Sequence, residues 1–209
     1  VGSEMCIRDR PKDMPTKQAA AAVGQCELMY TYDKLFNEYN HTVAQVLLTG
    51  EDVKNEQRSR NMRNTIFRLL ELGALPVINE NDTVATDEVG VENTIGENDT
   101  LSAIVAAAVH ADLLILLSDI DGLYDGDPHR DPTAKLIPVV PSIDAHILAL
   151  GGGSGSGLGT GGMATKLKAA QIVTEVGCQM VIANGSKPAL LYDIVGGKPV
   201  GTRFLAKEK

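Results

Sequence analysis

A glycine-rich segment that leads into a helix-forming segment is the part of the sequence best suited to bind phosphate groups. It reads GSGSGLGTGGMATK over residues 153–166. Glycines let backbone N–H groups turn inward, and the start of the following helix adds partial positive charge, so the segment suits phosphate oxygens. Lys166, one turn into that helix, could reach back as a point charge. A flexible surface loop or a domain linker has the same composition, so both interpretations stay open.

Two polar segments, Asn79–Asp82 (NEND) and Glu97–Asp99 (END), place amides beside carboxylates. An Asp can take the ammonium group of a zwitterion and an Asn can take its carboxylate, so together they could hold an amino acid. Asn and Asp are also routine turn and N-cap residues, and Asp99 or Thr100 would cap the next helix whatever the function. On the residues alone, the turn and capping interpretation is favoured.

Ser118 and Asp119 follow an apolar run, Leu113–Leu117, whose pattern predicts a strand buried on both faces. A small hydroxyl and a carboxylate at that edge suit contacts with a nucleotide or a metal, although a strand-terminating turn uses the same residues. The acidic steps at 119–122 and 125–127 lack the spacing and the late Glu of an EF-hand, which argues against that calcium site.

Alternating helices and strands must position these segments. Strands are predicted at 42–49, 75–79, 113–118 and 179–183, and helices at 16–39 with Thr16 as cap, 51–72, 100–110, 142–150, 163–176 and from Pro188 onward. Repeated alternation of the two predicts an α/β fold with a mainly parallel sheet. Ligands bind such sheets at the carboxyl ends of the strands, so we expect a site in the loops after Asn79, Leu117 and Ala183.

Composition excludes several classes of protein. The 209 residues carry 19 Lys and Arg against 27 Asp and Glu, a net charge of -8 that is opposite in sign to the charge expected of a nucleic-acid-binding protein. The apolar runs are far shorter than the roughly 20 residues of a membrane span. Cys6, Cys26 and Cys178 form no CxxC motif, which indicates a reducing, cytoplasmic compartment. Val1–Arg10 has no apolar core of a secretory signal, and we expect it to be a non-native leader.

Two familiar nucleotide motifs are poorly supported. Gly157, Gly159 and Gly162 formally match GxGxxG, but no strand precedes them and no acidic residue follows at the ribose-binding distance. A Rossmann dinucleotide site is therefore a weak interpretation. The Walker pattern that ends in Gly-Lys-Ser/Thr is absent, so a nucleotide at this loop requires another architecture.

Eight short segments, in order along the chain, resemble those of the glutamate 5-kinases, a family within the amino-acid kinase superfamily. They are KQAAAAVGQ (17–25), AQVLLT (44–49), PVINENDTV (76–84), GENDTLSA (96–103), LLSDIDGLY (116–124), GLGTGGMATK (157–166), ANGSKP (183–188) and GTRF (201–204). The resemblance covers nearly everything from Lys17 to Phe204. It implies a three-layer αβα sandwich with a mainly parallel central sheet, incomplete at the N-terminus.

The resemblance also implies a reaction. The family transfers the γ-phosphate of ATP to the side-chain carboxylate of L-glutamate, with Mg²⁺, in the first step of proline biosynthesis. A carboxylate nucleophile is already ionised at neutral pH, so no general base is needed. Repulsion between two anions is the difficulty, and positive charge near the phosphates must overcome it. The implied partners are L-glutamate and ATP, with proline as a feedback inhibitor and assembly as a homo-oligomer.

Residue roles follow from the same resemblance. Asp82 and Asn98 look like the glutamate-binding pair, and Lys166 is similar to the lysine that faces the transferring phosphoryl group. Asp99 is similar to the aspartate that orients the family's active-site lysines. The residues that look like nucleotide contacts are Ser118, Asp119, Thr160, Gly161, Gly162, Met163, Ala164, Thr165 and Lys166.

The chain departs from the family at its start. The family opens with a strand that carries a lysine and a Gly-Ser loop, followed by a strand that ends in a substrate-binding serine, and residues 1–10 stand in place of that region. The absent lysine would be the partner of Lys166, so we expect the 209-residue chain alone to be nearly inactive. The kinase domain is expected over 11–209, without the family's first strands and without the RNA-binding-like (PUA-type) C-terminal domain of its long members.

Three alternatives remain. The first is another amino-acid kinase acting on a different carboxylate or phosphate, which substrate competition would distinguish. The second is a non-catalytic remnant that binds glutamate or proline and assembles with intact subunits. The third is an NAD-binding oxidoreductase, which would bind NAD in place of ATP and Mg²⁺.

Overall fold

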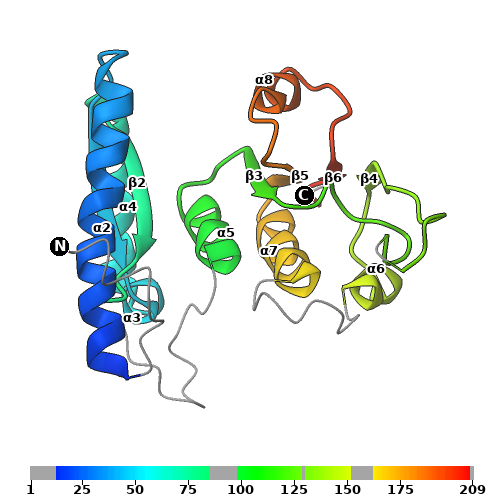
Figure 1. Cartoon of the computed structure of the whole chain (residues 1–209), viewed down its shortest axis with the longest axis horizontal. Coiled ribbons are helices and arrows are strands. Elements are labelled where there is room, and N and C mark those ends of the chain that lie inside the picture. Colours follow the sequence, from blue (N-terminus) through cyan, green and yellow to red (C-terminus); the bar gives the residue numbers. More distant parts are fainter. Residues whose placement is uncertain (1–12, 85–97, 129, 152–161, 208–209) are drawn as a thin grey trace. The chain divides into compact units, whose positions relative to one another are not determined.

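The computed structural model describes residues 13–84, 98–128, 130–151 and 162–207, which fall into two compact units divided between Gly96 and Glu97. Each unit is described by itself (Figure 1). Among the described helices, none combines the length and the apolar character needed to cross a membrane.

The first unit is built around two parallel strands. Its elements are α2 (Met14–Asn37), β1 (Val43–Leu48), α3 (Gly50–Lys54), α4 (Glu56–Glu71) and β2 (Leu75–Glu80). The strands pair in parallel from Val43 opposite Leu75 to Leu48 opposite Glu80. Parallel neighbours need a crossover connection, and α3 and α4 supply it. Helix α4 buries Met62 and Ile66, whereas α2 has no buried residue within this unit.

The second unit holds a four-stranded sheet. Its elements are α5 (Asn98–Ala108), β3 (Leu113–Ser118), β4 (Val139–Val140), α6 (Ala145–Leu150), α7 (Met163–Glu175), β5 (Gln179–Asn184), α8 (Leu190–Val195) and β6 (Thr202–Phe204). The strand order is β3-β5-β6-β4. Pairing is parallel except between β5 and β6. These pairings confirm the predicted α/β class with mainly parallel strands.

Alternate residues of β5 pack into two separate cores, one on each face of the sheet. Met180 and Ile182 belong to the larger cluster, which includes residues of α5 and α7, and Val181 and Ala183 belong to a smaller cluster with Ile194 of α8. Strand side chains alternate between the two faces of a sheet, so helices cover both faces. The second unit is therefore a helix–sheet–helix arrangement of three layers (Figure 1).

Strand β3 shows the same alternation. Leu114 and Leu116 pack with the larger cluster, while Leu113 and Ile115 pack with the smaller one. The prediction that this apolar run forms a strand is confirmed, and its side chains pack on both faces, but only Leu116 is buried and Leu117 is exposed.

Small residues let α5 and α7 approach each other closely. Ala103 and Ala106 of α5, and Ala169 and Ala170 of α7, are all buried in the larger cluster. With only a methyl group on each side, two helix backbones can lie near the short end of the usual 8–10 Å separation. Figure 1 shows the two helices side by side, and their residues are in contact. This packing brings the first turns of both helices together.

Several predicted helix boundaries are wrong. Helix α5 already includes Asn98, so Asp99 and Thr100 lie inside it and do not cap it. Helix α6 begins at Ala145 after its cap Asp144, and α8 begins at Leu190 and not at Pro188.

Asp13, not Thr16, caps α2, because its side chain accepts the backbone N–H of Thr16. The helix predicted over 51–72 is two helices, because Asn55 takes an extended conformation and ends α3. Its side chain then accepts the N–H of Arg58 and starts α4. The short strands β4 and β6 have too few residues for a periodic pattern and were not predicted.

Candidate functional site

A buried ion pair joins the first turns of α5 and α7. Lys166 Nζ lies 3.0 Å from Asp99 Oδ2, and the two side chains are only 11% and 19% exposed. The residues are 67 positions apart in the sequence, so the packing of the two helices creates the contact. A buried charge requires a partner, and this pairing fixes where the lysine ammonium lies.

Thr165 joins the same carboxylate. Its hydroxyl lies 2.9 Å from Asp99 Oδ2 and 2.8 Å from the carbonyl oxygen of Gly162. A hydroxyl has one proton to donate, so these two acceptors share it. Two adjacent residues of α7 thus converge on a single oxygen of Asp99.

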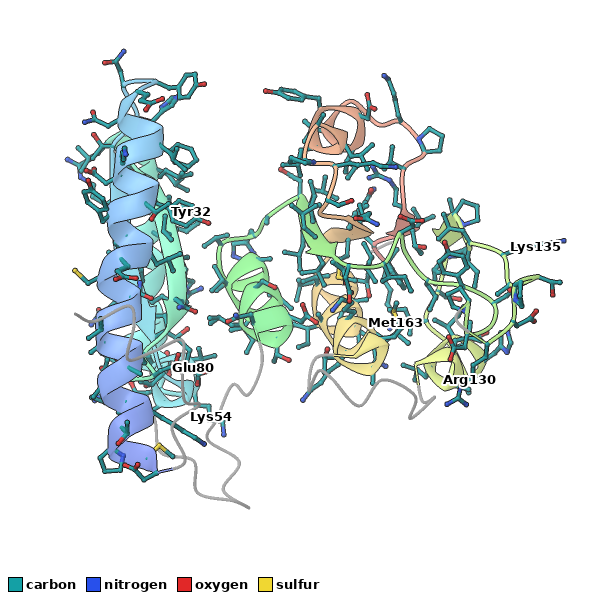
Figure 2. The ribbon with its side chains drawn as sticks, in the orientation of Figure 1. Tyr32, Lys54, Glu80, Arg130, Lys135 and Met163 are labelled. Atoms are coloured by element: carbon teal, nitrogen blue, oxygen red, sulfur yellow. The ribbon has the colours of Figure 1, made fainter. Side chains whose placement is uncertain are left out.

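The start of α7 suits an anionic ligand. Its N-cap is Gly162, which has no side chain to accept the N–H groups of the first turn. Uncapped N–H groups and the helix dipole favour a negatively charged oxygen at that end. Met163, labelled in Figure 2, is the first residue of the helix, and Lys166 is the fourth. Backbone donors and an ammonium group therefore lie within one turn of each other.

A second polar cluster lies at the carboxyl ends of β3 and β5. The Ser118 hydroxyl is 3.1 Å from the carboxylate of Asp119, which is exposed. Ser118 pairs in register with Asn184, and the N–H of Gly185 donates to the Ser118 carbonyl at 2.8 Å. Helix α7 and β5 are joined by a short turn and so run in opposite directions, which puts the start of α7 toward the same edge of the sheet.

The NEND segment belongs to the first unit. Asp82 is exposed in the turn that follows β2, whose last residue, Glu80, is labelled in Figure 2. Asn79 Nδ2 donates to Gln25 Oε1 at 3.0 Å, and the Thr83 hydroxyl bonds to Asn81. Gln25 therefore ties helix α2 to the end of β2. The sequence predicted no contact for Gln25, although KQAAAAVGQ was among the segments of the resemblance.

The predicted site residues fall into three groups. Asp99 and Lys166 are in contact, and Gly162, Met163, Ala164 and Thr165 lie beside them at the start of α7. Ser118 and Asp119 lie at the end of β3. Asn98, exposed at the first position of α5, is in the second unit and Asp82 is in the first, so their pairing stays a prediction. Thr160 and Gly161 lie outside the described residues.

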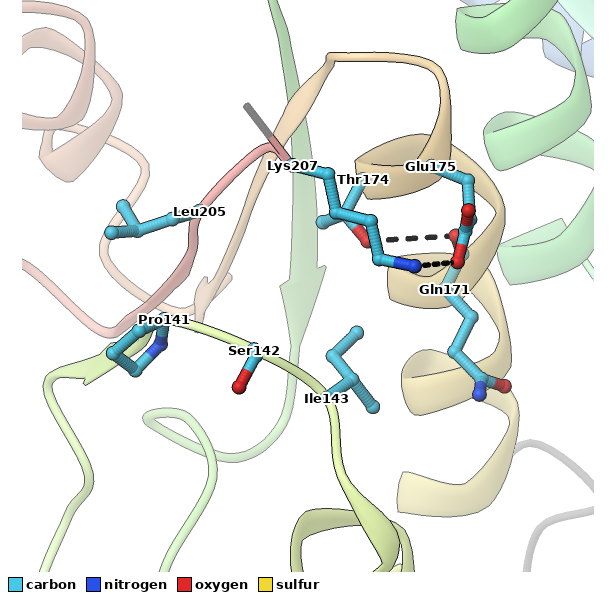
Figure 3. Close-up of a pocket in the computed structure, with 8 residues that line it drawn as sticks. All are labelled: Pro141, Ser142, Ile143, Gln171, Thr174, Glu175, Leu205 and Lys207. Carbon is cyan, nitrogen blue, oxygen red and sulfur yellow. Dashed lines mark hydrogen bonds and ion pairs between the residues drawn. The ribbon is translucent and has the colours of Figure 1, made fainter. Parts of the chain in front are cut away.

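A small hollow lies against the other half of α7 and is unrelated to these groups (Figure 3). It is lined by Pro141, Ser142, Ile143, Gln171, Thr174, Glu175, Leu205 and Lys207. Its cavity volume is about 40 Å³, whereas small-molecule sites occupy roughly 300–1,000 Å³. The Lys207–Glu175 ion pair crosses it. This hollow holds a few water molecules at most.

The amino acid kinase family profile matches residues 3–184 of the sequence, which is most of the chain. This chain belongs to the amino acid kinase family.

Curated relatives of this amino acid kinase include several named glutamate 5-kinase. The protein from Clostridium perfringens is 48% identical over 202 residues, which cover 97% of this chain and 75% of the relative. The protein from Clostridium acetobutylicum is 51% identical over 203 residues, with 97% and 74% covered. The protein from Clostridium tetani is 52% identical over 200 residues, with 96% and 73% covered.

Solved structures share the amino acid kinase fold at low sequence identity. Carbamate kinase from Giardia lamblia, bound to AMP-PNP, aligns with a TM-score of 0.61 at 16% identity, over 97% of this chain and 79% of that one. UMP kinase from Bacillus anthracis aligns with a TM-score of 0.62 at 16% identity, over 99% and 74%. These likenesses support the fold and carry no information about the substrate.

Proposed function

We propose that this chain is the catalytic domain of a glutamate 5-kinase, which transfers the γ-phosphoryl group of ATP to the side-chain carboxylate of L-glutamate. The observation that carries the proposal is the identity of about half of all residues to proteins of that name over nearly the whole chain. The Lys166–Asp99 pair at the start of α7 supports it, because phosphoryl transfer depends on positioned positive charge.

The reaction needs little from the protein besides position and charge. A glutamate carboxylate oxygen attacks the γ-phosphorus, the bond from that phosphorus to the β,γ-bridging oxygen breaks, and ADP leaves while γ-glutamyl phosphate forms. No proton moves, so no general base is required. Lys166 and the N–H groups of α7 stabilise the charge on the phosphoryl oxygens, and Asp99 holds Lys166 in place.

Magnesium suits the donors that the chain offers near the nucleotide. A nucleotide-bound Mg²⁺ takes most of its ligands from phosphate oxygens and water, so the protein need supply only one or two carboxylate oxygens. Asp119, exposed at the end of β3, has the right chemistry to do so. When bound, the ion neutralises phosphate charge. Feedback inhibition by proline, homo-oligomeric assembly and a cytoplasmic location are part of the proposal on resemblance alone.

The test has a binding arm and an activity arm. Calorimetric titration of the 209-residue chain with ATP and Mg²⁺ is expected to show one nucleotide site, while titration with NAD shows none. Hydroxylamine traps γ-glutamyl phosphate as a hydroxamate, which we expect to form in the complete native gene product and hardly at all with the 209-residue chain alone. Phosphorylation of another acceptor without any glutamate hydroxamate would overturn the proposal.

Lys166→Ala separates the proposed catalytic role from binding. In the complete native gene product, this substitution is expected to lower kcat by roughly a hundredfold or more, since it removes a charge that acts on the transferring group. The KM for glutamate should change much less. Lys168→Ala, two residues further along α7, is the matched control and should leave both constants near their original values. A larger effect on KM than on kcat would show that Lys166 acts in ground-state binding.

A further inference from the structure

The side chain of Asn184, the last residue of β5, bonds into the loop that follows β3. Its Nδ2 donates to Asp121 Oδ1 at 2.8 Å, and its Oδ1 accepts the backbone N–H of Ser186 at 2.9 Å. Both ends of the amide are used, so two partners fix its orientation. The bond joins residues 63 positions apart and connects the carboxyl ends of two neighbouring parallel strands.

The loop reached by Asn184 is held at both of its ends. At one end the N–H of Gly185 donates to the Ser118 carbonyl at 2.8 Å. At the other, the N–H of Leu123 donates to the buried hydroxyl of Thr202 at 2.8 Å. A Cβ at Gly122 would lie only 2.5 Å from that hydroxyl, so the loop is pressed against β6.

Between these anchors lie two exposed carboxylates, Asp119 and Asp121. Asp121 is bonded on one oxygen by Asn184, and its other oxygen lies 3.3 Å from the Tyr124 hydroxyl. Without the Asn184 bond, the Asp121 side chain would keep the longer bond from the Tyr124 hydroxyl, and it could then rotate within the loop. If the Asp121 carboxylate moved toward bound phosphates, it would repel them. The loop would also lose the Asn184–Asp121 bond, which lies between its two end anchors.

We infer that Asn184 is a positioning residue for the nucleotide-binding segment Ser118–Asp119, because its amide holds Asp121 and thereby the shape of the loop. The inference rests on the proposed function, since it takes Ser118 and Asp119 as nucleotide contacts. It also assigns a role to the ANGSKP segment, which the proposed reaction does not use.

A side-chain swap tests the bond directly. Asn184→Asp places two carboxylates against each other, and it is expected to weaken the binding of ATP and Mg²⁺ to the 209-residue chain roughly tenfold. Asp121→Asn keeps an acceptor for Asn184 and should bind nearly as tightly as the original chain. Combining Asn184→Asp with Asp121→Asn reverses donor and acceptor, keeps the net charge, and should restore most of the affinity. Ser186→Asp, which adds a charge nearby and keeps both the backbone N–H that bonds to Asn184 and the Asn184–Asp121 bond, is the control.

Hydrogen exchange of the amides at 119–124 supplies a readout that does not depend on the ligand. Their protection is expected to fall in Asn184→Asp and to return in the double variant. Unchanged affinity in Asn184→Asp, or lost affinity that the swap does not restore, would overturn the inference while the original chain still binds ATP. Absence of ATP binding in the original chain would overturn the proposed nucleotide site. Hydrogen exchange would then still report whether the Asn184–Asp121 bond holds the loop.

Discussion

Asp99 is bonded by two of the other candidate site residues. The Lys166 ammonium and the Thr165 hydroxyl converge on one of its oxygens, and the three side chains come from the first turns of two helices. A carboxylate in such a position sets both the location and the charge balance of its neighbours. The resemblance assigns Thr165 to the nucleotide loop, whereas the hydrogen bond indicates that it also positions Asp99.

Thr165→Val distinguishes these two roles. Valine keeps the shape of threonine and removes the hydroxyl, so Asp99 loses one hydrogen bond. If Thr165 positions Asp99, kcat in the complete native gene product should fall roughly tenfold while the Kd for ATP and Mg²⁺ changes less than twofold. Thr165→Ser, which keeps the hydroxyl, should recover most of kcat. An equal loss in nucleotide affinity would instead identify Thr165 as a direct nucleotide contact.

Particular side chains and glycines set where helices and strands begin in both units. Helix α3 starts with a capping box, in which Thr49 and Asp52 each bond to the other's backbone or side chain. Strand β6 can approach β5 closely because Gly201 has no side chain and a φ of +66°. Each feature gives a measurable contribution to stability.

Asp52→Ala removes the capping box of α3. We expect the free energy of unfolding to fall by about 1 kcal/mol at pH 7. The Thr49 hydroxyl, bonded to the carboxylate, holds the pKa of Asp52 below its ordinary 3.8. Because the pKa is lowered in the folded state, the ionised Asp52 carboxylate stabilises the fold at pH values above 3.8. This stabilisation is lost as the pH falls from 3.8 through the folded-state pKa.

Urea unfolding followed by circular dichroism, at pH 7 and again below pH 3.8, measures the difference between Asp52→Ala and the original chain. The difference should shrink at the lower pH. Glu51→Ala, a neighbouring exposed carboxylate outside the capping box, is the control and should cost much less. A difference that stays constant with pH would contradict the assigned role of the carboxylate.

Gly201→Ala and Gly197→Ala form a matched pair. Both glycines have positive φ, +66° and +80°, so both substitutions carry the same backbone strain of about 1 kcal/mol. A Cβ at Gly201 would lie 2.0 Å from the carbonyl oxygen of Ile182, whereas a Cβ at Gly197 would meet nothing within 4 Å. Thermal unfolding should therefore show a loss of about 3 kcal/mol or more for Gly201→Ala. Equal losses would mean that the β5–β6 contact does not limit this position.

At the scale of the whole molecule, the charge of the chain and the charge of its proposed substrates have the same sign. The net charge is -8, and both ATP and glutamate are anions. We therefore propose that binding depends on local groups, namely Lys166 and the uncapped start of α7, which act over short distances in a partly buried setting. The effect of each ligand on the stability of the folded chain can be measured.

ATP with Mg²⁺ is expected to stabilise the folded chain. A ligand at about a hundred times its Kd adds about 2.7 kcal/mol to the free energy of unfolding, so the melting temperature should rise. Hydrogen exchange should show the added protection at residues 118–121 and at the start of α7. NAD at the same concentration is the control and should change neither quantity. Equal protection by NAD would favour the dinucleotide-binding alternative over the kinase.

The sequence by itself determined the class of fold, the order of its longer strands and helices, and the short segments that resemble glutamate 5-kinases. Those features depend on local patterns: apolar runs for β3 and β5, and glycine before α7. Helix breaks were harder to predict, since Asn55 both ends α3 and starts α4 within an otherwise helical segment.

The resemblance implied that Asp99 orients Lys166, but only the tertiary structure shows how these side chains, and those of Asn184 and Asp121, come into contact. Asp99 reaches Lys166 across 67 residues because buried alanines let α5 and α7 pack closely, and Asn184 reaches Asp121 because β3 and β5 pair in a particular parallel register. Neither contact follows from the residues near it in the chain. Pairings of this kind arise from how whole elements pack, since a shift of one residue in a strand turns every side chain to the other face.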